Sequence, residues 1–184
     1  VCVFRVYLIH NTNQLCNSYS NKFYKLNNLK KIQDPMLELG RFCVDPNYRD
    51  PKIIMTAWSA IRKLVEKNKI KFLFGCSSFI GTSIDRYLDC FKFLKTKYIA
   101  PKKYNLYVKA PKVFKFNNLI NLNNFCLKKA KKNLPPLLSF YLNLGGWVSD
   151  HVVIDYDLET MHVFTGLEVK EIPEKRLNFL KKIN

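Results

Sequence analysis

Glu38 is a lone carboxylate in an apolar stretch of sequence, and a short basic turn follows that stretch. Residues 37–46 have the composition of a strand, with Leu37 and Leu39 beside the carboxylate. A charged group in such surroundings must be paired or take part in chemistry. The turn over residues 47–52 leads into an amphipathic helix, whose first N–H groups and positive dipole end favour an anion. A phosphate-bearing donor beside a base indicates group transfer, with Glu38 as the candidate catalytic residue.

Four further residues of this segment are candidates for the site. Arg41 follows Glu38 by three positions, so on a regular strand the two side chains point to opposite faces. Asp45, Arg49 and Lys52 belong to the turn that we assign to cofactor binding, where the two cations could hold phosphate. The turn lacks the glycines of a P-loop or a dinucleotide fingerprint, which excludes both of those sites. The alternatives are a solvated carboxylate on an edge strand and a solvated connector.

Histidines and cysteines offer weaker signals. Asp150-His151 and His162 fall in two neighbouring predicted strands, where a histidine pair could bind metal, but no third ligand is evident. Hydrogen-bonded structural histidines are the favoured interpretation. The six cysteines, at positions 2, 16, 43, 76, 90 and 126, form no C-x-x-C motif. We expect them to be reduced in a cytoplasm, with Cys43 and Cys76 as small hydrophobes in core strands.

The elements that must position these residues follow from hydrophobic periodicity. The predicted strands cover residues 1–9, 37–44, 70–79, 106–108, 147–154 and 160–169, and the predicted helices begin near residues 54, 82 and 135. We expect a long polar loop over residues 10–33 and a poorly patterned basic connector over residues 117–133. A β-α-β centre with strands on both sides predicts a single α/β domain with a mixed central sheet.

Composition narrows the class of partner. The net charge is +17, which indicates an acidic partner or an anionic membrane surface, or else the codon drift of an AT-rich genome. The lysines are scattered, which argues against a nucleic-acid stripe. We find no run of about 18 uncharged apolar residues and no secretory signal. Residues 1–8 have the character of a buried strand from the first position, so we expect a preceding segment of the domain.

Three ordered motifs resemble the signature of bacterial ornithine–acyl carrier protein N-acyltransferases. They are Leu37-Glu38-Leu39-Gly40-Arg41-Phe42-Cys43-Val44-Asp45-Pro46 with Arg49-Asp50-Pro51, then Phe74-Gly75-Cys76-Ser77-Ser78-Phe79 with Gly81-Thr82, and Leu134-Pro135-Pro136-Leu137-Leu138 continuing through Leu144-Gly145-Gly146-Trp147-Val148-Ser149-Asp150-His151 to Glu168. The Glu38-x-x-Arg41 strand is also similar to that of acyl-homoserine lactone synthases. The resemblance extends from Leu37 to Pro173.

The resemblance implies a GNAT-like acyltransferase fold with a mixed central sheet flanked by helices, lacking its N-terminal part. It implies transfer of a 3-hydroxyacyl chain from acyl carrier protein to the α-amino group of ornithine, giving lyso-ornithine lipid. The 3-hydroxyacyl-acyl carrier protein, a phosphopantetheine thioester, would be a co-substrate, with no permanently bound cofactor and no metal. Its phosphate would lie at the strand–turn–helix over residues 44–54. Peripheral contact with the inner face of an anionic membrane fits such a product.

The residues leave two rival functions open. A non-catalytic or split-gene remnant could still bind acyl carrier protein or membrane, or the acceptor could be a different amino acid. Nucleic-acid binding rests on charge alone, and we expect none. In the catalytic hypothesis Glu38 takes the proton of the amine, and backbone N–H groups of residues 41–44 stabilise the oxyanion.

Overall fold

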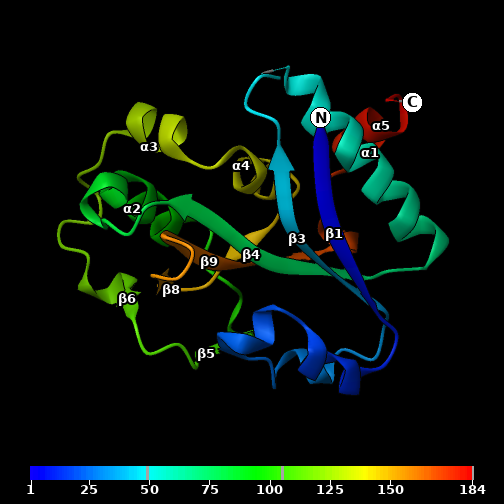
Figure 1. Ribbon diagram of the computed structural model, residues 1–184, viewed down its shortest axis with the longest axis horizontal. Helices are drawn as coiled ribbons and strands as arrows, with labels where there is room; N and C mark the ends of the chain where they lie inside the picture. The colour runs from blue at the N-terminus through cyan, green and yellow to red at the C-terminus, as the bar shows by residue number, and fades with distance from the viewer. Residues whose placement is uncertain (49, 105, 184) are drawn as a thin grey trace.

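The computed structural model describes residues 1–48, 50–104 and 106–183. These residues form a seven-stranded sheet in the order β1-β3-β4-β9-β8-β6, with β7 pairing with β9 (Figure 1). Strand β3 pairs with β4 in parallel and with β1 antiparallel, so the sheet is mixed, as predicted. The strands are β1 (Cys2–Ile9), β3 (Met36–Val44), β4 (Phe72–Ile80), β6 (Val113–Lys115), β7 (Trp147–Val148), β8 (His151–Asp155) and β9 (Thr160–Glu168).

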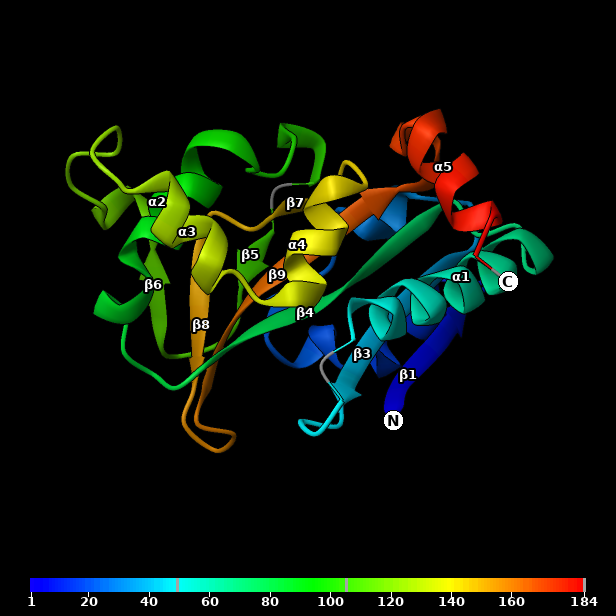
Figure 2. The same cartoon turned by 90° about the horizontal axis from the view of Figure 1, so that it is seen from above.

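Alternate residues of the strands serve two different cores, one on each face of the sheet. Leu37 and Leu73 pack under helices on one face, whereas their neighbours Met36 and Phe72 pack against residues 9–29 on the other. Figure 2 shows the helices in front of the sheet and the N-terminal segment, in blue, behind it. The helices are α1 (Pro51–Lys67), α2 (Leu88–Lys97), α3 (Leu127–Asn133), α4 (Pro136–Asn143) and α5 (Glu174–Lys181).

Strands β3 and β4 pair over a short length and then separate. Met36–Glu38 pair with Phe72–Phe74, and no pairing of these two strands continues beyond Glu38 within the described residues. Gly75 follows immediately, and any Cβ there would overlap the backbone carbonyl of Leu39. Figure 1 shows the two arrows pointing away from each other. The splay opens the sheet directly beside the Glu38 side chain.

A β-bulge in β3 changes the direction in which Arg41 points. Arg5 pairs with Gly40 and Val3 pairs with Cys43, so two residues of β3 lie opposite Phe4 alone. Arg41 has a φ of 51°, in the left-handed region. The extra residue inverts the alternation of the strand, so our expectation that Arg41 and Glu38 lie on opposite faces is wrong.

The long N-terminal segment is more ordered than the predicted loop. It contains three short 3-10 helices, η1 (Thr12–Asn17), η2 (Ser20–Lys22) and η3 (Leu29–Lys31). Strand β2 (Tyr24–Lys25) lies between η2 and η3 and pairs with β5 (Tyr107–Val108). Buried apolar side chains hold this layer against the sheet, namely Leu15, Tyr24, Leu26 and Leu29. These four side chains position the segment on the sheet, so it is a packed layer and not the open polar loop that we expected.

Several boundaries differ from the predictions for local reasons. A 3-10 turn, η4 (Asp85–Tyr87), precedes α2, so that helix begins later than residue 82. The basic connector contains helix α3, because Ala130 is fully buried against α2. The predicted strand over residues 147–154 is interrupted between β7 and β8. Strand β6 and helix α5 have no counterpart in the prediction.

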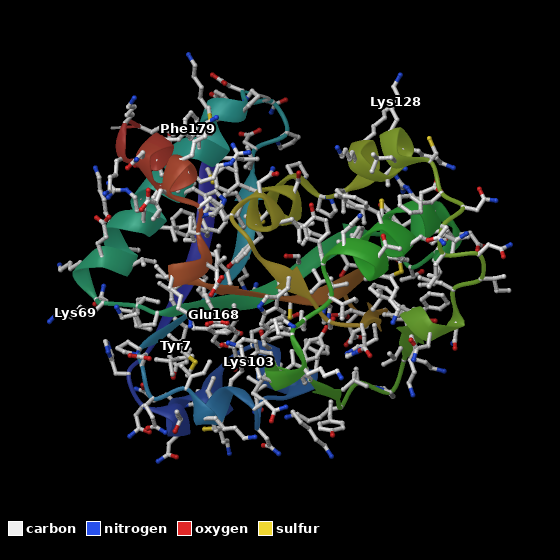
Figure 3. The ribbon with its side chains drawn as sticks, turned by 180° about the vertical axis from the view of Figure 1, so that it is seen from behind. Tyr7, Lys69, Lys103, Lys128, Glu168 and Phe179 are labelled. Atoms are coloured by element: carbon white, nitrogen blue, oxygen red, sulfur yellow. The ribbon has the colours of Figure 1, made fainter. Side chains whose placement is uncertain are left out.

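An ion-pair cluster lies at the end of β9, beside the start of β4. The Lys103 ammonium lies 2.6 Å from one oxygen of Glu168 (Figure 3). The Lys170 ammonium lies 3.3 Å from the other oxygen. Burial raises the pKa of Glu168, but hydrogen bonds from Lys103, Tyr104 and Lys170 outweigh it and hold that pKa below its ordinary value. Within the described part of the chain, each helix is too short or too polar to span a lipid bilayer.

Candidate active site

The splay between β3 and β4 holds a cavity of about 140 Å³. Glu38 and Arg41 both line it, so the structure brings the two predicted catalytic residues together. The full lining comprises Arg5, Tyr19, Glu38, Leu39, Gly40, Arg41, Cys76, Ser78 and Leu158. One carboxylate and two guanidinium groups therefore face a small space beside backbone that β4 no longer pairs.

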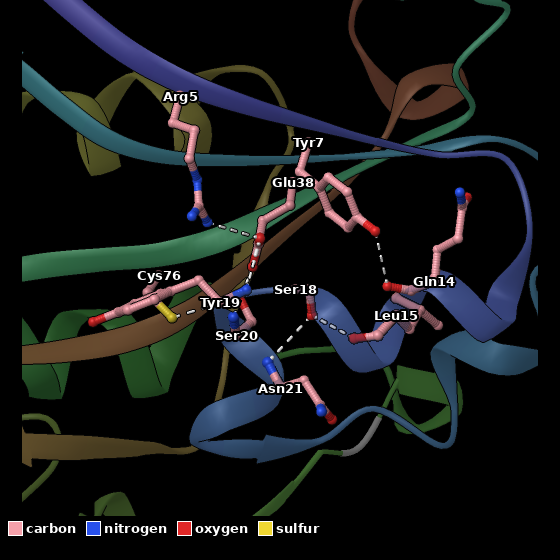
Figure 4. A network of polar contacts seen from close by, with 10 residues as sticks. All are labelled: Arg5, Tyr7, Gln14, Leu15, Ser18, Tyr19, Ser20, Asn21, Glu38 and Cys76. Atoms are coloured by element: carbon pink, nitrogen blue, oxygen red, sulfur yellow. Dashed lines mark hydrogen bonds and ion pairs between the residues drawn. The ribbon is translucent and has the colours of Figure 1, made fainter.

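The Glu38 carboxylate is buried and held by three donors. Its side chain is 2% exposed. The backbone N–H of Ser20 donates to Oε1 at 2.7 Å, and the N–H of Tyr19 donates to Oε2 at 2.9 Å (Figure 4). The Arg5 guanidinium lies 3.3 Å from Oε2. These contacts satisfy a buried charge, and they also fasten the N-terminal layer to the sheet.

A carboxylate in this position can still accept a proton. Each carboxylate oxygen has two lone-pair sites. Oε1 accepts one hydrogen bond from the backbone, and the cavity lies beside the side chain. Glu38 therefore anchors the N-terminal layer through its contacts, lines the cavity, and keeps one lone-pair site of Oε1 without a donor among the hydrogen bonds of the described residues.

Cys76 also lines this cavity, but its thiol has low reactivity. Its Sγ lies 3.6 Å from Ser20 Oγ. Burial raises the pKa of the Cys76 thiol to about 12, so the thiol stays protonated and is a poor nucleophile. Cys43, which we expected in the core, is exposed, because it follows the bulge and pairs with Val3, whose side chain is also exposed.

The turn between β3 and α1 differs from the predicted anion site. The Asp50 carboxylate accepts the Lys52 N–H at 2.8 Å and caps the helix, and Pro51 has no N–H. The expectation of free N–H groups in this first turn is therefore wrong at the backbone of Lys52. The side chain of Lys52 is exposed and could still contact an anion. The Asp45 carboxylate accepts the Asn47 N–H at 2.9 Å. Arg49 lies outside the described residues.

His151 and His162 are buried side chains with hydrogen-bond partners on one side each. Nδ1 of His151 lies 2.8 Å from Asp150 Oδ1, and Nδ1 of His162 lies 3.2 Å from the Tyr24 hydroxyl. Burial lowers the pKa of His162 to about 4, so its ring is neutral at pH 7. Among the described residues, no cluster of three His, Cys, Asp or Glu side chains has the geometry for a metal ion.

Several residues of the cavity were not predicted from the sequence. Arg5 is a lone charge among the apolar residues of β1, so the argument that selected Glu38 would also have selected Arg5. Tyr19 and Ser20 contact Glu38 through backbone N–H groups, which leave no signature in side-chain composition. Leu158 reaches the cavity from the turn between β8 and β9, and only the three-dimensional arrangement reveals it.

Comparison with known proteins supports the resemblance seen in the motifs. Residues 1–59 match the acetyltransferase (GNAT) domain family. The chain is 29% identical over 161 residues to the L-ornithine N(alpha)-acyltransferase of Rhodobacter capsulatus, covering 88% of this chain and 61% of the relative. It is 29% identical over 143 residues to the protein of the same name from Rhizobium meliloti, covering 78% and 48%. The protein of that name from Brucella abortus is 28% identical over 163 residues, covering 88% and 58%.

These matches confirm the family resemblance and the fold class that were predicted from the sequence. The chain resembles L-ornithine N(alpha)-acyltransferases over most of its length, residues 1–59 match the GNAT domain family, and the structure has the mixed sheet flanked by helices that was predicted. The chain spans roughly half to three-fifths of the length of these relatives. No solved structure gives a significant match.

Proposed function

We propose that this protein is an N-acyltransferase that moves a 3-hydroxyacyl chain from acyl carrier protein to the α-amino group of ornithine, giving lyso-ornithine lipid. The observation that carries the proposal is the meeting of Glu38 and Arg41 in one cavity at the splay of β3 and β4. The names of the relatives support ornithine as the acceptor. The acyl carrier protein as donor and the lipid product come from the motif resemblance.

In this mechanism the thioester carbonyl of the donor enters the gap between the two strands. The ornithine nitrogen attacks the carbonyl carbon, the carbon–sulfur bond breaks, and the pantetheine thiol leaves as it takes up a proton. Backbone N–H groups of residues 41–44 lie on the part of β3 that does not pair with β4. We assign the stabilisation of the oxyanion to these groups.

Glu38 is our candidate for the general base. The ornithine ammonium must lose a proton before its nitrogen can attack, and Glu38 takes it directly or through a water molecule in the cavity. The one lone-pair site that remains, on Oε1, supplies the acceptor. Arg41 faces the same cavity and is exposed, so its guanidinium is placed to hold the ornithine carboxylate in a bidentate pair.

The donor phosphate is assigned to the turn between β3 and α1. Because Asp50 already occupies the Lys52 N–H, we assign the contact to the side chains of Lys52 and Arg49, with Asp45 holding the shape of the turn through Asn47. No permanently bound cofactor is needed in this scheme. Acyl carrier protein is the macromolecular partner, and peripheral contact with an anionic membrane would serve delivery of the product.

One observation favours a second candidate, a binding protein without catalysis. Both oxygens of Glu38 already accept backbone hydrogen bonds, as an anchoring carboxylate would. Such a chain would still bind acyl carrier protein or membrane but would transfer nothing.

A transfer assay separates the two candidates. The protein is incubated with radiolabelled ornithine and 3-hydroxyacyl-acyl carrier protein, and lipid-extractable label is measured. We expect labelled product with ornithine and much less with glycine or with free acyl-coenzyme A as donor. Binding of acyl carrier protein without labelled product would contradict the enzymatic proposal and favour the binding protein. Equal rates with glycine would refute ornithine as the specific acceptor.

A further inference from the structure

The cavity at the splay is too small to enclose a lipid-length chain. Its volume is about 140 Å³, whereas pockets that enclose drug-sized ligands measure about 300–1,000 Å³. The reacting thioester and the amine of an amino acid match the smaller volume. The remainder of a long acyl chain must therefore lie outside the cavity.

An apolar surface begins where the cavity ends. Ser78 lines the cavity from one face of β4, and Ile80 is the next residue on that face. Ile80 is 75% exposed. Leu158 lines the same cavity from the β8–β9 turn and is 62% exposed. The Gly81 N–H donates to the Glu159 carbonyl at 2.9 Å, which ties the end of β4 to this turn.

We propose that Ile80, Leu158 and Tyr156 form an acyl rim, a surface on which the hydrocarbon chain of the donor lies as it leaves the cavity. Tyr156 belongs to the same turn as Leu158 and is 61% exposed. Single exposed hydrophobic side chains are ordinary, but here one of the three lines the cavity itself, one follows the cavity residue Ser78 on the same face of β4, and one shares a turn with Leu158. The inference rests on the proposed function and adds a determinant of acyl-chain length.

The acyl rim gives longer chains an advantage over shorter ones. Each methylene that reaches the rim leaves water for an apolar contact, and the gain grows with chain length until the surface is covered. A butanoyl chain ends within or near the cavity, whereas a tetradecanoyl chain extends across the rim. The acyl rim should therefore raise kcat/KM for the long-chain donor relative to kcat/KM for the short-chain donor.

The test uses Ile80→Asp with Ile120→Asp as its matched control. Ile120 is 76% exposed and lies between 3-10 helix η6 (Phe116–Asn118) and α3, so both substitutions place a carboxylate on an exposed isoleucine. Transfer is measured with 3-hydroxytetradecanoyl- and 3-hydroxybutanoyl-acyl carrier protein, which match the proposed donor and differ in chain length. We expect Ile80→Asp to lower the long-to-short ratio of kcat/KM by about tenfold, mainly through KM. Ile120→Asp should leave the ratio unchanged.

A second measurement keeps the proposal testable without turnover. A tetradecanoyl chain with a terminal photoreactive group is loaded on acyl carrier protein and crosslinked to the protein. Labelling at Ile80, Tyr156 or Leu158 supports the acyl rim. Labelling elsewhere overturns it. An equal loss of kcat/KM for both chain lengths in Ile80→Asp also overturns it, whether or not that variant binds anionic vesicles more weakly. Absence of transfer with every donor refutes the proposed function instead, and the crosslink then decides the rim by itself.

Discussion

The Arg5 guanidinium lies 3.3 Å from Glu38 Oε2, across two neighbouring strands and beside the Tyr19 N–H that binds the same oxygen. The carboxylate thus joins three segments: β1, β3 and the N-terminal layer. A substitution at Glu38 will affect both the proposed chemistry and the packing of that layer. Experiments on this residue must measure stability together with activity.

We expect Glu38→Gln to lower the transfer rate by about 10²–10⁴-fold, the usual effect of losing a general base. The substitution also directs an NH₂ group at the backbone N–H of Tyr19 or Ser20, which should lower the free energy of unfolding by about 1–3 kcal/mol. Turnover and urea unfolding are measured on the same preparation. As pH rises, more ornithine is already deprotonated, so the rate deficit should shrink.

Arg5→Gln provides the control for this substitution. It leaves both backbone hydrogen bonds of Glu38 in place and removes a half-exposed partner, so the stability change should stay below about 1 kcal/mol. If Glu38→Gln keeps a constant rate deficit at every pH, Glu38 is an anchor and the base lies elsewhere.

The sequence was sufficient to predict that Glu38 is a buried and paired carboxylate, because a lone charge in an apolar strand is a strong local signal. It was insufficient to orient Arg41. The bulge that turns Arg41 toward the cavity depends on how β3 pairs with β1, and pairing register is a property of two strands rather than one. The parallel pairing of β3 with β4 was expected from the β-α-β pattern, whereas the point where it stops was not.

Short helices and strands were the other elements that could not be predicted from the sequence. Strand β6 contains three residues, too few for a period-two pattern to be recognised. Helix α3 is strongly basic, and its only buried residue is Ala130, so its apolar stripe is almost absent. Long periodic elements such as α1 were predicted correctly because an apolar face repeats over several turns.

We expect the free energy of unfolding to fall as pH drops from about 6.5 to about 4 because of His162. Burial lowers the pKa of His162 from 6.5 to about 4 in the folded protein. The unfolded chain therefore binds a proton in this range while the folded chain does not, and the stabilisation is complete above the unfolded pKa. Its size is about 3 kcal/mol. Urea unfolding across this pH range measures it, and His162→Gln should flatten the slope.

Association with acyl carrier protein should weaken as salt rises. The net charge of +17 attracts an acidic partner, and exposed charges are screened beyond about 8 Å at physiological ionic strength. Calorimetric titration at low and high salt measures the change. Affinity that is indifferent to salt would show that the basic surface does not recognise this partner and would favour codon drift as its origin.

Arg41→Gly should separate backbone strain from side-chain function. Arg41 and Lys69 both have a φ of 51°, a conformation that costs a residue with a Cβ about 1–2 kcal/mol, whereas glycine adopts it freely at a smaller entropic cost. Each glycine variant should therefore unfold at equal or higher urea concentration, with a gain of up to about 1 kcal/mol. Lys69 follows α1 (Figure 3) and is not among the residues that line the cavity, so Lys69→Gly should retain full transfer activity. Arg41→Gly should raise KM for ornithine by about 10- to 100-fold, the effect of losing a charged hydrogen bond, and Arg41→Lys should recover part of the loss. An unchanged KM in Arg41→Gly would show that the guanidinium does not hold the ornithine carboxylate, whatever the change in stability.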